Sequence, residues 1–365
     1  MTPVPASPAD VPASPADVPG DAPADGPGDG SGDRPGDGSG DVPGGPPVRV
    51  GLVGAGVMGR DHAMTLARSV PGAALVTVTD PDPDRAAEVA AATGCRVAVD
   101  ADALLGDPGV DAVLVASPDD THEALVLACL AAGKPVLCEK PLAPDAETAL
   151  RIVRAEAASG RRLVRVGFMR RHDPGYLAMR RALDSGDLGA PLLLHCRHRN
   201  AASTPAFTSD MLLTSSATHE IDIVRWLLRE EIVAVSVRTG RASRRAPAGV
   251  VDPRLLLLRT ASGVLVDVEV FVNAGYGYDV RCELVGERGV HRLSPAPVSR
   301  DWRDRFAVAY RDQLRAWVGG LRRGAPDGPT AWDGYAATSV ALAAVRSARS
   351  GREEAVTMAD AVTPG

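Results

Sequence analysis

A glycine-rich turn between two apolar runs constrains the fold of this chain more than any other feature. Residues 48–53 form a short apolar run that leads into the turn 54–59, Gly-Ala-Gly-Val-Met-Gly. A helix-forming stretch follows at 62–70, and a second apolar run, 73–79, ends at Asp80. This order is a complete unit of strand, Gly-x-Gly-x-x-Gly, helix, strand and acid. It predicts a doubly wound parallel sheet that binds a dinucleotide.

The members of this unit have separate physical tasks. Gly54 allows the tight turn, Gly56 lets the backbone approach a pyrophosphate at the helix N-terminus, and Gly59 lets the helix pack closely on the strand. Asp80 would accept hydrogen bonds from ribose hydroxyls and repel a 2′-phosphate, which favours NAD over NADP even with Arg85 nearby. The predicted cofactor is therefore NAD, and the predicted contacts are Gly54, Ala55, Gly56, Val57, Met58, Gly59 and Asp80.

Two later strands carry polar residues at their carboxyl ends. The run 111–116 leads into Ser-Pro-Asp-Asp-Thr-His at 117–122, and the run 135–138 ends at Glu-Lys-Pro, 139–141. Ligands of open α/β sheets bind at the carboxyl ends of the strands. These two loops and the glycine turn are therefore expected to line one crevice.

Lysine usage singles out one residue of that crevice. Of the 40 cationic residues only Lys134 and Lys140 are lysines, and the other 38 are arginines. A lysine ammonium is compact and changes its pKa on burial, which a guanidinium does not do. Lys134 lies beside a Gly-x-Pro turn and is interpreted as an ordinary surface residue. Lys140 stands at a strand end and is the first candidate for chemistry.

The amino-terminal 47 residues differ from the rest in composition. They hold 12 of the 30 prolines, eight Asp, one Arg and no aromatic residue. Such a segment buries too little apolar surface to offset its chain entropy, and it is predicted to be a disordered tail. Its net charge of −7 leaves +1 for the remainder of a chain whose total is −6. The folded part has no basic excess, so no nucleic-acid partner is expected.

Cysteine spacing and hydropathy indicate the compartment. The five cysteines are scattered, without a Cys-x-x-Cys pair, which argues against a metal cluster or a disulfide framework. No cationic start with an apolar core resembles a signal peptide, and no uncharged apolar run is long enough to span a membrane. We expect a cytoplasmic protein with reduced thiols, no metal and no membrane partner.

A second domain follows the dinucleotide-binding domain, which is placed at 48–167. After a helix at 146–158 and a strand at 163–168, the pattern changes to short apolar runs separated by turns. This predicts an α+β domain, 168–365, with a large open and mostly antiparallel sheet, and with late helices packing near the domain junction. The predicted strands are 191–195, 232–237, 254–260, 264–272 and 278–285, and the predicted helices are 220–228, 306–321 and 332–347.

Several strings give this chain a family resemblance that runs from Val48 to about residue 350. They are the glycine turn, Glu139-Lys140-Pro141-Leu142, Val166-Gly167-Phe168-Met169-Arg170-Arg171, His198-Arg199-Asn200, Thr218-His219-Glu220-Ile221-Asp222, Tyr276-Gly277-Tyr278-Asp279 and residues 328–335. With them the chain resembles the Gfo/Idh/MocA oxidoreductases, and within that family the branch of bacterial inositol 2-dehydrogenases.

The resemblance implies an activity and a set of site residues. A secondary alcohol of an inositol would be oxidised, myo-inositol to 2-keto-inositol, by hydride transfer to NAD. His219 would act as the base, and Lys140 would bridge the hydroxyl and the cofactor ribose. The resemblance also implies a homotetramer built on the open sheet face. The implied nicotinamide contacts are Ser117, Pro118, Thr121, His122, Glu139 and Lys140, and the implied substrate contacts are Lys140, Arg170, His198, Asn200, Ser215, His219 and Tyr278.

Two positions depart from the family pattern. Ser215 stands four residues before His219, where the family usually has an Asp that contacts substrate and stabilises the imidazolium. A serine hydroxyl can form hydrogen bonds but carries no charge. Asp210 is near in sequence, but the family has an Asp there as well, so it is a weak substitute. His172 stands where close relatives tend to have Tyr.

The departure at Ser215 leaves three readings open. Ser215 is tolerated in an inositol dehydrogenase, or it adapts the pocket to another cyclitol, an aminocyclitol or a sugar derivative. In the third reading the chain is a catalytically weak dinucleotide-binding protein. Retention of Lys140 and His219 argues against the third reading.

Overall fold

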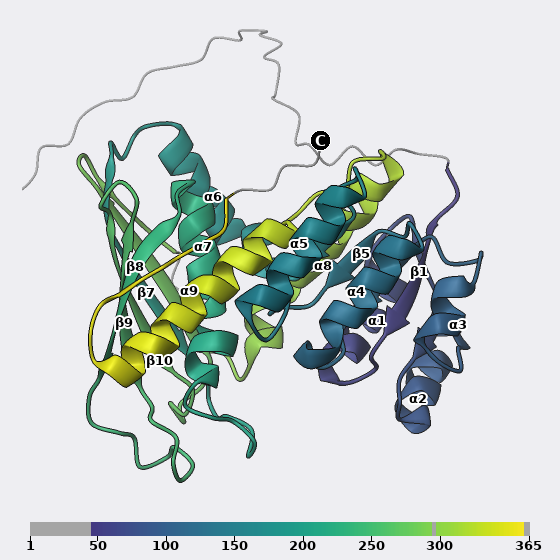
Figure 1. Cartoon of the computed structure of the whole chain (residues 1–365), viewed down its shortest axis with the longest axis horizontal. Helices are drawn as coiled ribbons and strands as arrows, with labels where there is room; N and C mark the ends of the chain where they lie inside the picture. Colours follow the sequence, from purple (N-terminus) through teal and green to yellow (C-terminus); the bar gives the residue numbers. More distant parts are fainter. Residues whose placement is uncertain (1–44, 294–296, 361–365) are drawn as a thin grey trace, which may run out of the picture. The chain divides into compact units, whose positions relative to one another are not determined.

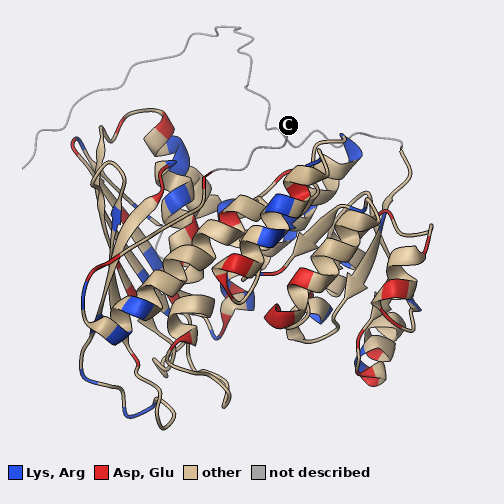
Figure 2. Ribbon diagram, viewed as in Figure 1, with Lys and Arg blue, Asp and Glu red and all other residues tan. Residues whose placement is uncertain are grey.

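Two sheets and the long helices beside them make up the described part of the chain (Figure 1). The computed structural model describes residues 45–293 and 297–360. The predicted tail, 1–47, lies outside the described residues except for its last three positions. Lys and Arg are interspersed with Asp and Glu along both halves of the ribbon (Figure 2). In the described ranges, no helix is long and apolar enough to cross a membrane, and no cluster of His, Cys, Asp or Glu could hold a metal.

The first sheet has six parallel strands in the order β3-β2-β1-β4-β5-β6. Its central strands are apolar and buried because helices cover both faces, as the doubly wound prediction requires. The chain moves outward in one direction from β1 and then in the other from β4, so the switch point lies between these two strands. The bounds are β1 (Val48–Val53), β2 (Ala73–Thr79), β3 (Arg96–Val97), β4 (Ala112–Val115), β5 (Val136–Cys138) and β6 (Val164–Val166).

Three helices of this first half, α2, α3 and α5, begin at side-chain caps that the sequence supplies. Asp82 accepts hydrogen bonds from the backbone N–H groups of Asp84 and Arg85, and Asp145 accepts one from Thr148. Each cap satisfies an N–H group that the first helical turn leaves without a partner. The bounds are α1 (Val57–Ser69), α2 (Pro83–Thr93), α3 (Ala101–Gly106), the 3₁₀ turn η1 (Asp119–Thr121), α4 (His122–Ala131) and α5 (Ala146–Ala158).

The second sheet has seven strands in the order β12-β11-β7-β10-β9-β8-β13. All neighbouring pairs are antiparallel except β7 with β10, which confirms the predicted large and mostly antiparallel sheet. Buried and exposed residues alternate along β9, so one face packs on the core and the other is open. The bounds are β7 (Pro191–Arg199), β8 (Ile232–Thr239), β9 (Arg254–Thr260), β10 (Leu265–Phe271), β11 (Asp279–Gly286), β12 (Val290–Arg292) and β13 (Glu354–Ala355).

The remaining helical elements pack on this sheet or between the sheets. The polar stretch 201–217 contains a π-helical turn. On α8, Leu314, Trp317 and Val318 pack into the apolar cluster of β1 and α1, whereas α9 packs on α5 and β8. The two late helices therefore contact elements of both halves. The bounds are η2 (Met169–His172), α6 (Pro174–Asp184), η3 (Leu212–Ser216), α7 (Thr218–Leu228), α8 (Trp302–Arg322) and α9 (Ala331–Ser350).

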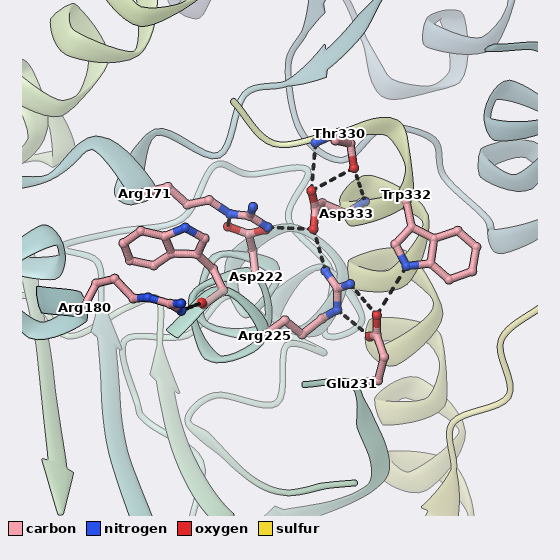
Figure 3. A network of polar contacts seen from close by, with 9 residues as sticks. Arg171, Arg180, Asp222, Arg225, Glu231, Thr330, Trp332 and Asp333 are labelled. Carbon is pink, nitrogen blue, oxygen red and sulfur yellow. Dashed lines mark hydrogen bonds and ion pairs between the residues drawn. The ribbon is translucent and has the colours of Figure 1, made fainter. Parts of the chain in front are cut away.

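A chain of ion pairs ties α7 to its neighbours (Figure 3). Arg171 of η2 holds Asp222 of α7 at 2.5 Å and Asp333 of α9 at 2.9 Å. Arg225, one turn further along α7, contacts the same Asp333 at 3.1 Å and Glu231 at 2.6 Å. Arg225 is buried and the Arg171 side chain is only 13% exposed, so carboxylates rather than water satisfy most of each guanidinium. The network sets the position of α7 against η2 and α9.

Asp333 takes part in this network and also caps α9. Its carboxylate accepts the backbone N–H of Thr330 at 2.8 Å, while the Thr330 hydroxyl accepts the N–H of Asp333, which completes a capping box. Burial opposes ionisation, but the two arginines and the cap outweigh it and lower the pKa of Asp333. One carboxylate therefore connects the start of α9 to the ion pairs on α7.

We expect Arg171→Met to destabilise the fold strongly. The substitution leaves Asp222, whose side chain is 1% exposed, as a buried charge without its partner, at a cost of about 3–5 kcal/mol. The matched control is Arg60→Met, because Arg60 and its partner Glu88 are both exposed and such pairs contribute less than about 1 kcal/mol. Denaturant unfolding compares the two free energies of unfolding, and equal small losses would contradict a structural role for the network.

Candidate active site

The glycine turn leaves an open backbone cradle at the start of α1. Gly54 has a φ of +94°, and a Cβ there would lie 2.6 Å from the carbonyl oxygen of Ala116. A Cβ on Gly59 would lie 1.8 Å from the oxygen of Gly54, so this position also requires glycine. A Cβ on Gly56 would meet nothing within 4 Å. Gly54 and Gly59 thus serve close packing inside the protein, whereas Gly56 faces space that a ligand can enter.

That space is a cavity of about 1140 Å³ beside the cradle. Asp80 lies in its wall, with one carboxylate oxygen accepting the N–H of Ala55 at 2.6 Å and the other accepting the N–H of Asp82 at 2.8 Å. These bonds fix the carboxylate and leave each oxygen a further lone pair. Arg85 lies in the same wall but pairs with Asp82 at 3.2 Å. The wall also includes Val57, Met58, Thr79, Asp100, Ser117, Pro118 and Thr121.

A second cavity, of about 310 Å³, adjoins the first at the carboxyl ends of β4 and β5. The two cavities share Met58, Ala116 and Ser117 in their walls, so a ligand of the first reaches the second. Of the predicted site residues, the structure brings Ser117, Glu139, Lys140, His198, Asn200, Ser215, His219 and Tyr278 into this wall. They come from both halves of the molecule.

Lys140 enters the second cavity from the end of β5. Its Nζ lies 3.5 Å from the backbone carbonyl oxygen of Ser215, which it contacts as a donor. Glu139 lies behind it, accepting the backbone N–H of Lys140 at 3.1 Å and bonding His62 Nε2 at 2.8 Å. Burial favours the neutral acid, but His62 and Lys140 outweigh it and lower the pKa of Glu139. An ionised Glu139 therefore fixes the backbone from which Lys140 projects.

His122 has a different place from the one predicted for a nicotinamide contact. Its ring is 1% exposed and lies between the carbonyl oxygen of Ser117 at 3.0 Å and that of Pro141 at 2.9 Å. It belongs to neither cavity wall. His122 instead connects the loop after β4 to the loop after β5. On the same loop, Ser117 Oγ and Thr121 Oγ1 lie 2.7 Å apart.

The π-helical turn η3 and the start of α7 bring Ser215 and His219 to one side of the cavity. His219 is 7% exposed, and its Nδ1 is buried without a hydrogen-bond partner among the described residues. Nε2 is therefore the ring nitrogen left to the cavity. Burial and the charges of Arg170 and Lys140 lower the pKa of His219 well below its ordinary value. The imidazole is therefore neutral at physiological pH and can accept a hydrogen bond.

Arg170, predicted to contact substrate, lies behind the cavity wall. Its guanidinium is 1% exposed and is held by Glu220, with Nη2 also 3.3 Å from His198 Nδ1. Glu220 Oε2 lies 3.0 Å from the same His198 nitrogen. Burial raises the pKa of Glu220, but Arg170 and His198 outweigh it and lower that pKa. Arg170 thus orients a lining residue and does not itself reach the cavity.

Comparison with known proteins accords with this geometry. The model of an oxidoreductase family with an NAD-binding Rossmann fold matches residues 48–168, and the Gfo/Idh/MocA C-terminal domain matches residues 176–292. Inositol 2-dehydrogenase 1 of Saccharopolyspora erythraea is 57% identical over 328 residues, which cover 86% of this chain and 97% of that protein. The chain belongs to the Gfo/Idh/MocA oxidoreductase family. The resemblance drawn from the sequence motifs is confirmed.

Two further relatives extend the comparison. The inositol 2-dehydrogenase of Streptomyces avermitilis is 50% identical over 324 residues, covering 85% of this chain and 94% of that protein. The crystal structure of myo-inositol dehydrogenase from Lactobacillus casei, in complex with NAD(H) and myo-inositol, has a TM-score of 0.84 at 35% identity. It covers 86% of this chain and 98% of that chain. The family assignment therefore holds for sequence and fold over nearly the full length of these relatives.

The sequence motifs did not predict several residues that line the second cavity. Phe207, Trp302 and Tyr310 form part of the wall, and the rings of Trp302 and Tyr310 lie 5.1 Å apart. Their signal was weak because Phe207 lies in a polar stretch and the other two lie at the start of an amphipathic helix, α8. Aromatic faces suit the C–H faces of a cyclic polyol. The remaining unpredicted members of the wall are Ala116, Asp119, Met169 and Ser216.

The structure places Asp210 and His172 outside both cavity walls. Asp210 pairs with Arg349 at 2.6 Å and is absent from both cavity walls, so it does not replace a carboxylate at 215. His172 is also outside the walls; its Nε2 is buried and has no partner within the described ranges. Burial lowers the pKa of His172 to about 4.

Cofactor choice gives a first test of the cradle. We expect Asp80→Ser to narrow the preference for NAD over NADP by about tenfold or more, because it removes the negative charge that would meet a 2′-phosphate. Asp102→Ser, in the first turn of α3 and outside the cavity wall, serves as the control. Fluorescence titration with NADH and NADPH measures both dissociation constants. An unchanged ratio for Asp80→Ser would contradict the assigned position of the ribose.

His172 gives a pH-dependent test. The unfolded state binds a proton at His172 more readily than the folded state does, because burial lowers the pKa of this histidine only in the folded state. The stability of the fold that depends on a neutral His172 is complete above pH 6.5 and is lost as the pH falls from 6.5 to about 4. The loss attributable to His172 is about 3 kcal/mol over this window. We expect the free energy of unfolding of His172→Gln to fall less steeply than that of the wild type between these pH values, and parallel curves would contradict the burial effect.

Proposed function

We propose that this chain is an NAD-dependent dehydrogenase that oxidises a secondary alcohol of an inositol, myo-inositol to 2-keto-inositol. The observation that carries the proposal is the meeting of Lys140 and His219 in a small polar cavity that adjoins the dinucleotide crevice. The relatives named above as inositol 2-dehydrogenases support the substrate class. In this proposal residues 48–167 bind NAD, and residues 168–365 bind substrate and form the oligomer.

The residues fit NAD on three grounds. Gly56 leaves space at the N-terminus of α1 for a pyrophosphate, Asp80 offers fixed lone pairs to a ribose, and Ser117 lies where the two cavities meet. Bound NAD would accept the hydride from the alcohol carbon. The residues proposed to hold it are Gly54, Ala55, Gly56, Val57, Met58, Gly59, Asp80, Ser117, Pro118, Thr121, Glu139 and Lys140, with His122 supporting the loops from behind.

The proposed chemistry follows from the charge of Lys140 and from the positions of the side chains that line the second cavity. The Lys140 ammonium would donate to the reacting hydroxyl, favour its loss of a proton and hold its carbon close to the nicotinamide. His219 Nε2 would take the hydrogen bond of that hydroxyl, because its neutral ring is an acceptor at physiological pH. His198, Asn200, Ser215 and Tyr278 would contact the other hydroxyls, with Arg170 acting through His198.

The proposed oligomeric state is a homotetramer, and the proposed compartment is the cytoplasm. The open face of the second sheet exposes apolar side chains between charged ones, and an interface between copies would bury them. The five cysteines all occur as free thiols, which suits a reducing compartment. The exposed apolar residues of this face are Leu193, Leu255, Leu257 and Leu265.

We expect the purified chain to reduce NAD in the presence of myo-inositol, and Lys140→Met to lower kcat by about 100-fold or more. Lys134→Met is the matched control, because Lys134 Nζ donates to the carbonyls of Asp107 and Val110 and lies outside the cavity. Nicotinamide absorbance measures turnover with myo-inositol, scyllo-inositol, glucose and aminocyclitols.

The substrate panel distinguishes the three functions that the Ser215 substitution leaves open. Turnover of an inositol supports the proposal, and preference for another member of the panel would replace inositol with that compound. Tight NADH binding without turnover of any member would contradict a dehydrogenase acting on these alcohols and favour a dinucleotide-binding protein. Equal activity of Lys140→Met and Lys134→Met would contradict the role of Lys140.

A further inference from the structure

His62 lies on the same helix as the glycine cradle but belongs to neither cavity wall. It stands on α1, six residues after Gly56, and its side chain is 1% exposed. Its Nε2 lies 2.8 Å from Oε1 of Glu139, whose side chain is 8% exposed. One helix therefore faces the dinucleotide crevice with its N-terminus and the end of β5 with this histidine.

Glu139 connects His62 to the backbone of Lys140. Its Oε1 is bonded to His62, and its Oε2 accepts the backbone N–H of Lys140 at 3.1 Å. Burial raises the pKa of Glu139, but His62 and Lys140 outweigh it and lower that pKa. An ionised carboxylate only accepts hydrogen bonds, so His62 Nε2 carries the hydrogen and acts as the donor. The carboxylate is therefore held from two sides, by α1 and by the residue after it on the chain.

Gly167, directly after β6, leaves the space in which this carboxylate lies. A Cβ at position 167 would lie 2.9 Å from Glu139 Oε1 and 3.0 Å from Oε2. The backbone N–H of Gly167 donates to the carbonyl of Cys138 at 2.8 Å, which holds this point of the chain beside β5. Glycine is the residue that permits such a close approach. A larger residue at 167 would displace the carboxylate from its present place.

The ring of His62 has one described polar contact. It packs edge-on against Tyr310 of α8, with the ring centroids 5.8 Å apart. Its Nδ1 is buried and has no hydrogen-bond partner among the described residues, so the polar contact of the ring is the one from Nε2 to Glu139. Removing one partner of a buried hydrogen bond leaves the other unsatisfied. Loss of the His62 donor would therefore act on Glu139 first.

The groups around this pair leave Glu139 as the one whose ionisation can change in an ordinary assay. Burial and Glu139 raise the pKa values of Tyr310 and Cys138 well above their usual range, so both are neutral there. Burial also raises the pKa of Asp61, which lies 3.7 Å from Arg303 of α8. The titratable or charged groups that face the pair are Asp61 on α1, Cys138 and Lys140 at the end of β5, and Arg303 and Tyr310 on α8.

We propose that His62 is a positioning residue: its donor nitrogen holds the Glu139 carboxylate, and Glu139 fixes the backbone at Lys140 so that the ammonium meets the reacting hydroxyl. The inference rests on the proposed dehydrogenase function and leaves His219 Nε2 as the acceptor of that hydroxyl's hydrogen bond. Because His62 lies outside both cavity walls, its effect should fall on kcat more than on dinucleotide binding.

His62→Leu and His62→Gln separate the donor from the bulk of the ring. His62→Leu has no donor and should lower kcat with myo-inositol and NAD by about 10- to 100-fold, since a small displacement of a catalytic group has an effect of this size. His62→Gln keeps an N–H donor and should stay within about threefold of wild type. Equal losses in the two variants would indicate packing alone and overturn the inference.

NADH binding and a second histidine serve as controls for these variants. Both His62 variants should bind NADH within about threefold of wild type, because the glycine cradle and Asp80 are unchanged, and this binding also reports a folded protein. His291→Leu on β12, outside both cavity walls, should leave kcat and NADH binding unchanged. A loss of NADH binding that matches the loss of kcat in His62→Leu would contradict a positioning role.

The pH profile distinguishes positioning through Glu139 from a general loss of structure. Without the His62 donor, only Lys140 opposes the effect of burial, so the pKa of Glu139 rises. Glu139 then becomes neutral at a higher pH, and a neutral carboxyl group holds the backbone N–H of Lys140 less strongly. The acid limb of kcat should therefore move to higher pH in His62→Leu and stay in place in His62→Gln and His291→Leu. An unmoved acid limb in His62→Leu would overturn the inference.

Gly167→Ala tests the pair with the histidine in place, including where His62→Leu does not fold. The added Cβ pushes the end of the flexible Glu139 side chain, so kcat should fall by about tenfold or more. Gly106→Ala on α3, where a Cβ meets nothing within 4 Å, is the matched control. Wild-type kcat in Gly167→Ala or in His62→Leu would overturn this inference alone. A wild-type chain that oxidises no inositol would contradict the proposed function and, with it, this inference.

Discussion

The position of α7 depends on carboxylates and guanidinium groups that are buried together. Glu220 meets Arg170, Asp222 meets Arg171, and Arg225 meets Asp333 of α9. Nearly every residue of α7 is buried, so the helix cannot satisfy these charges with water and must lie where their partners are. The same helix carries His219 into the cavity. The ion pairs that locate α7 therefore also locate the candidate base against Lys140 on the other sheet.

Local sequence patterns were sufficient to predict most of the strands and helices. The runs 48–53 and 73–79 and the helix 146–158 agree with the structure at both ends, since their period and caps lie within the segment itself. Other features depend on distant partners. β7 continues to Arg199, beyond the predicted end at 195, because β10 and β11 pair with it on either side. The two-residue strands and the π-helical turn in 201–217 have too short a pattern to be predicted.

The residues of the candidate site also divide into those that the sequence predicted and those that only the structure reveals. The strand-end argument predicted Lys140 at the crevice, because the carboxyl ends of parallel strands meet at one edge of the sheet, and the family resemblance predicted His198, Ser215 and His219 as substrate contacts. A motif does not distinguish a residue that lines a cavity from one behind it. Arg170 and His122 both belong to motifs, yet one holds Glu220 and the other bonds two backbone carbonyls. The aromatic residues of α8 in the cavity wall, Trp302 and Tyr310, follow His219 by more than 80 residues, and only the fold brings them to the cavity.

The environment of Ser215 shows that the loss of a charge in the sequence has to be judged from the contacts in the structure. In sequence, replacing Asp at this position removes a charge one helical turn before His219. In the structure, the backbone carbonyl of Ser215 contacts Lys140, so the position retains a role that does not depend on its side chain. The nearest carboxylate to a cavity imidazole comes instead from Glu220, the residue directly after His219, and it contacts His198 on β7. Adjacent residues on α7 thus have different tasks, since His219 lines the cavity and Glu220 holds the ring of His198 on β7.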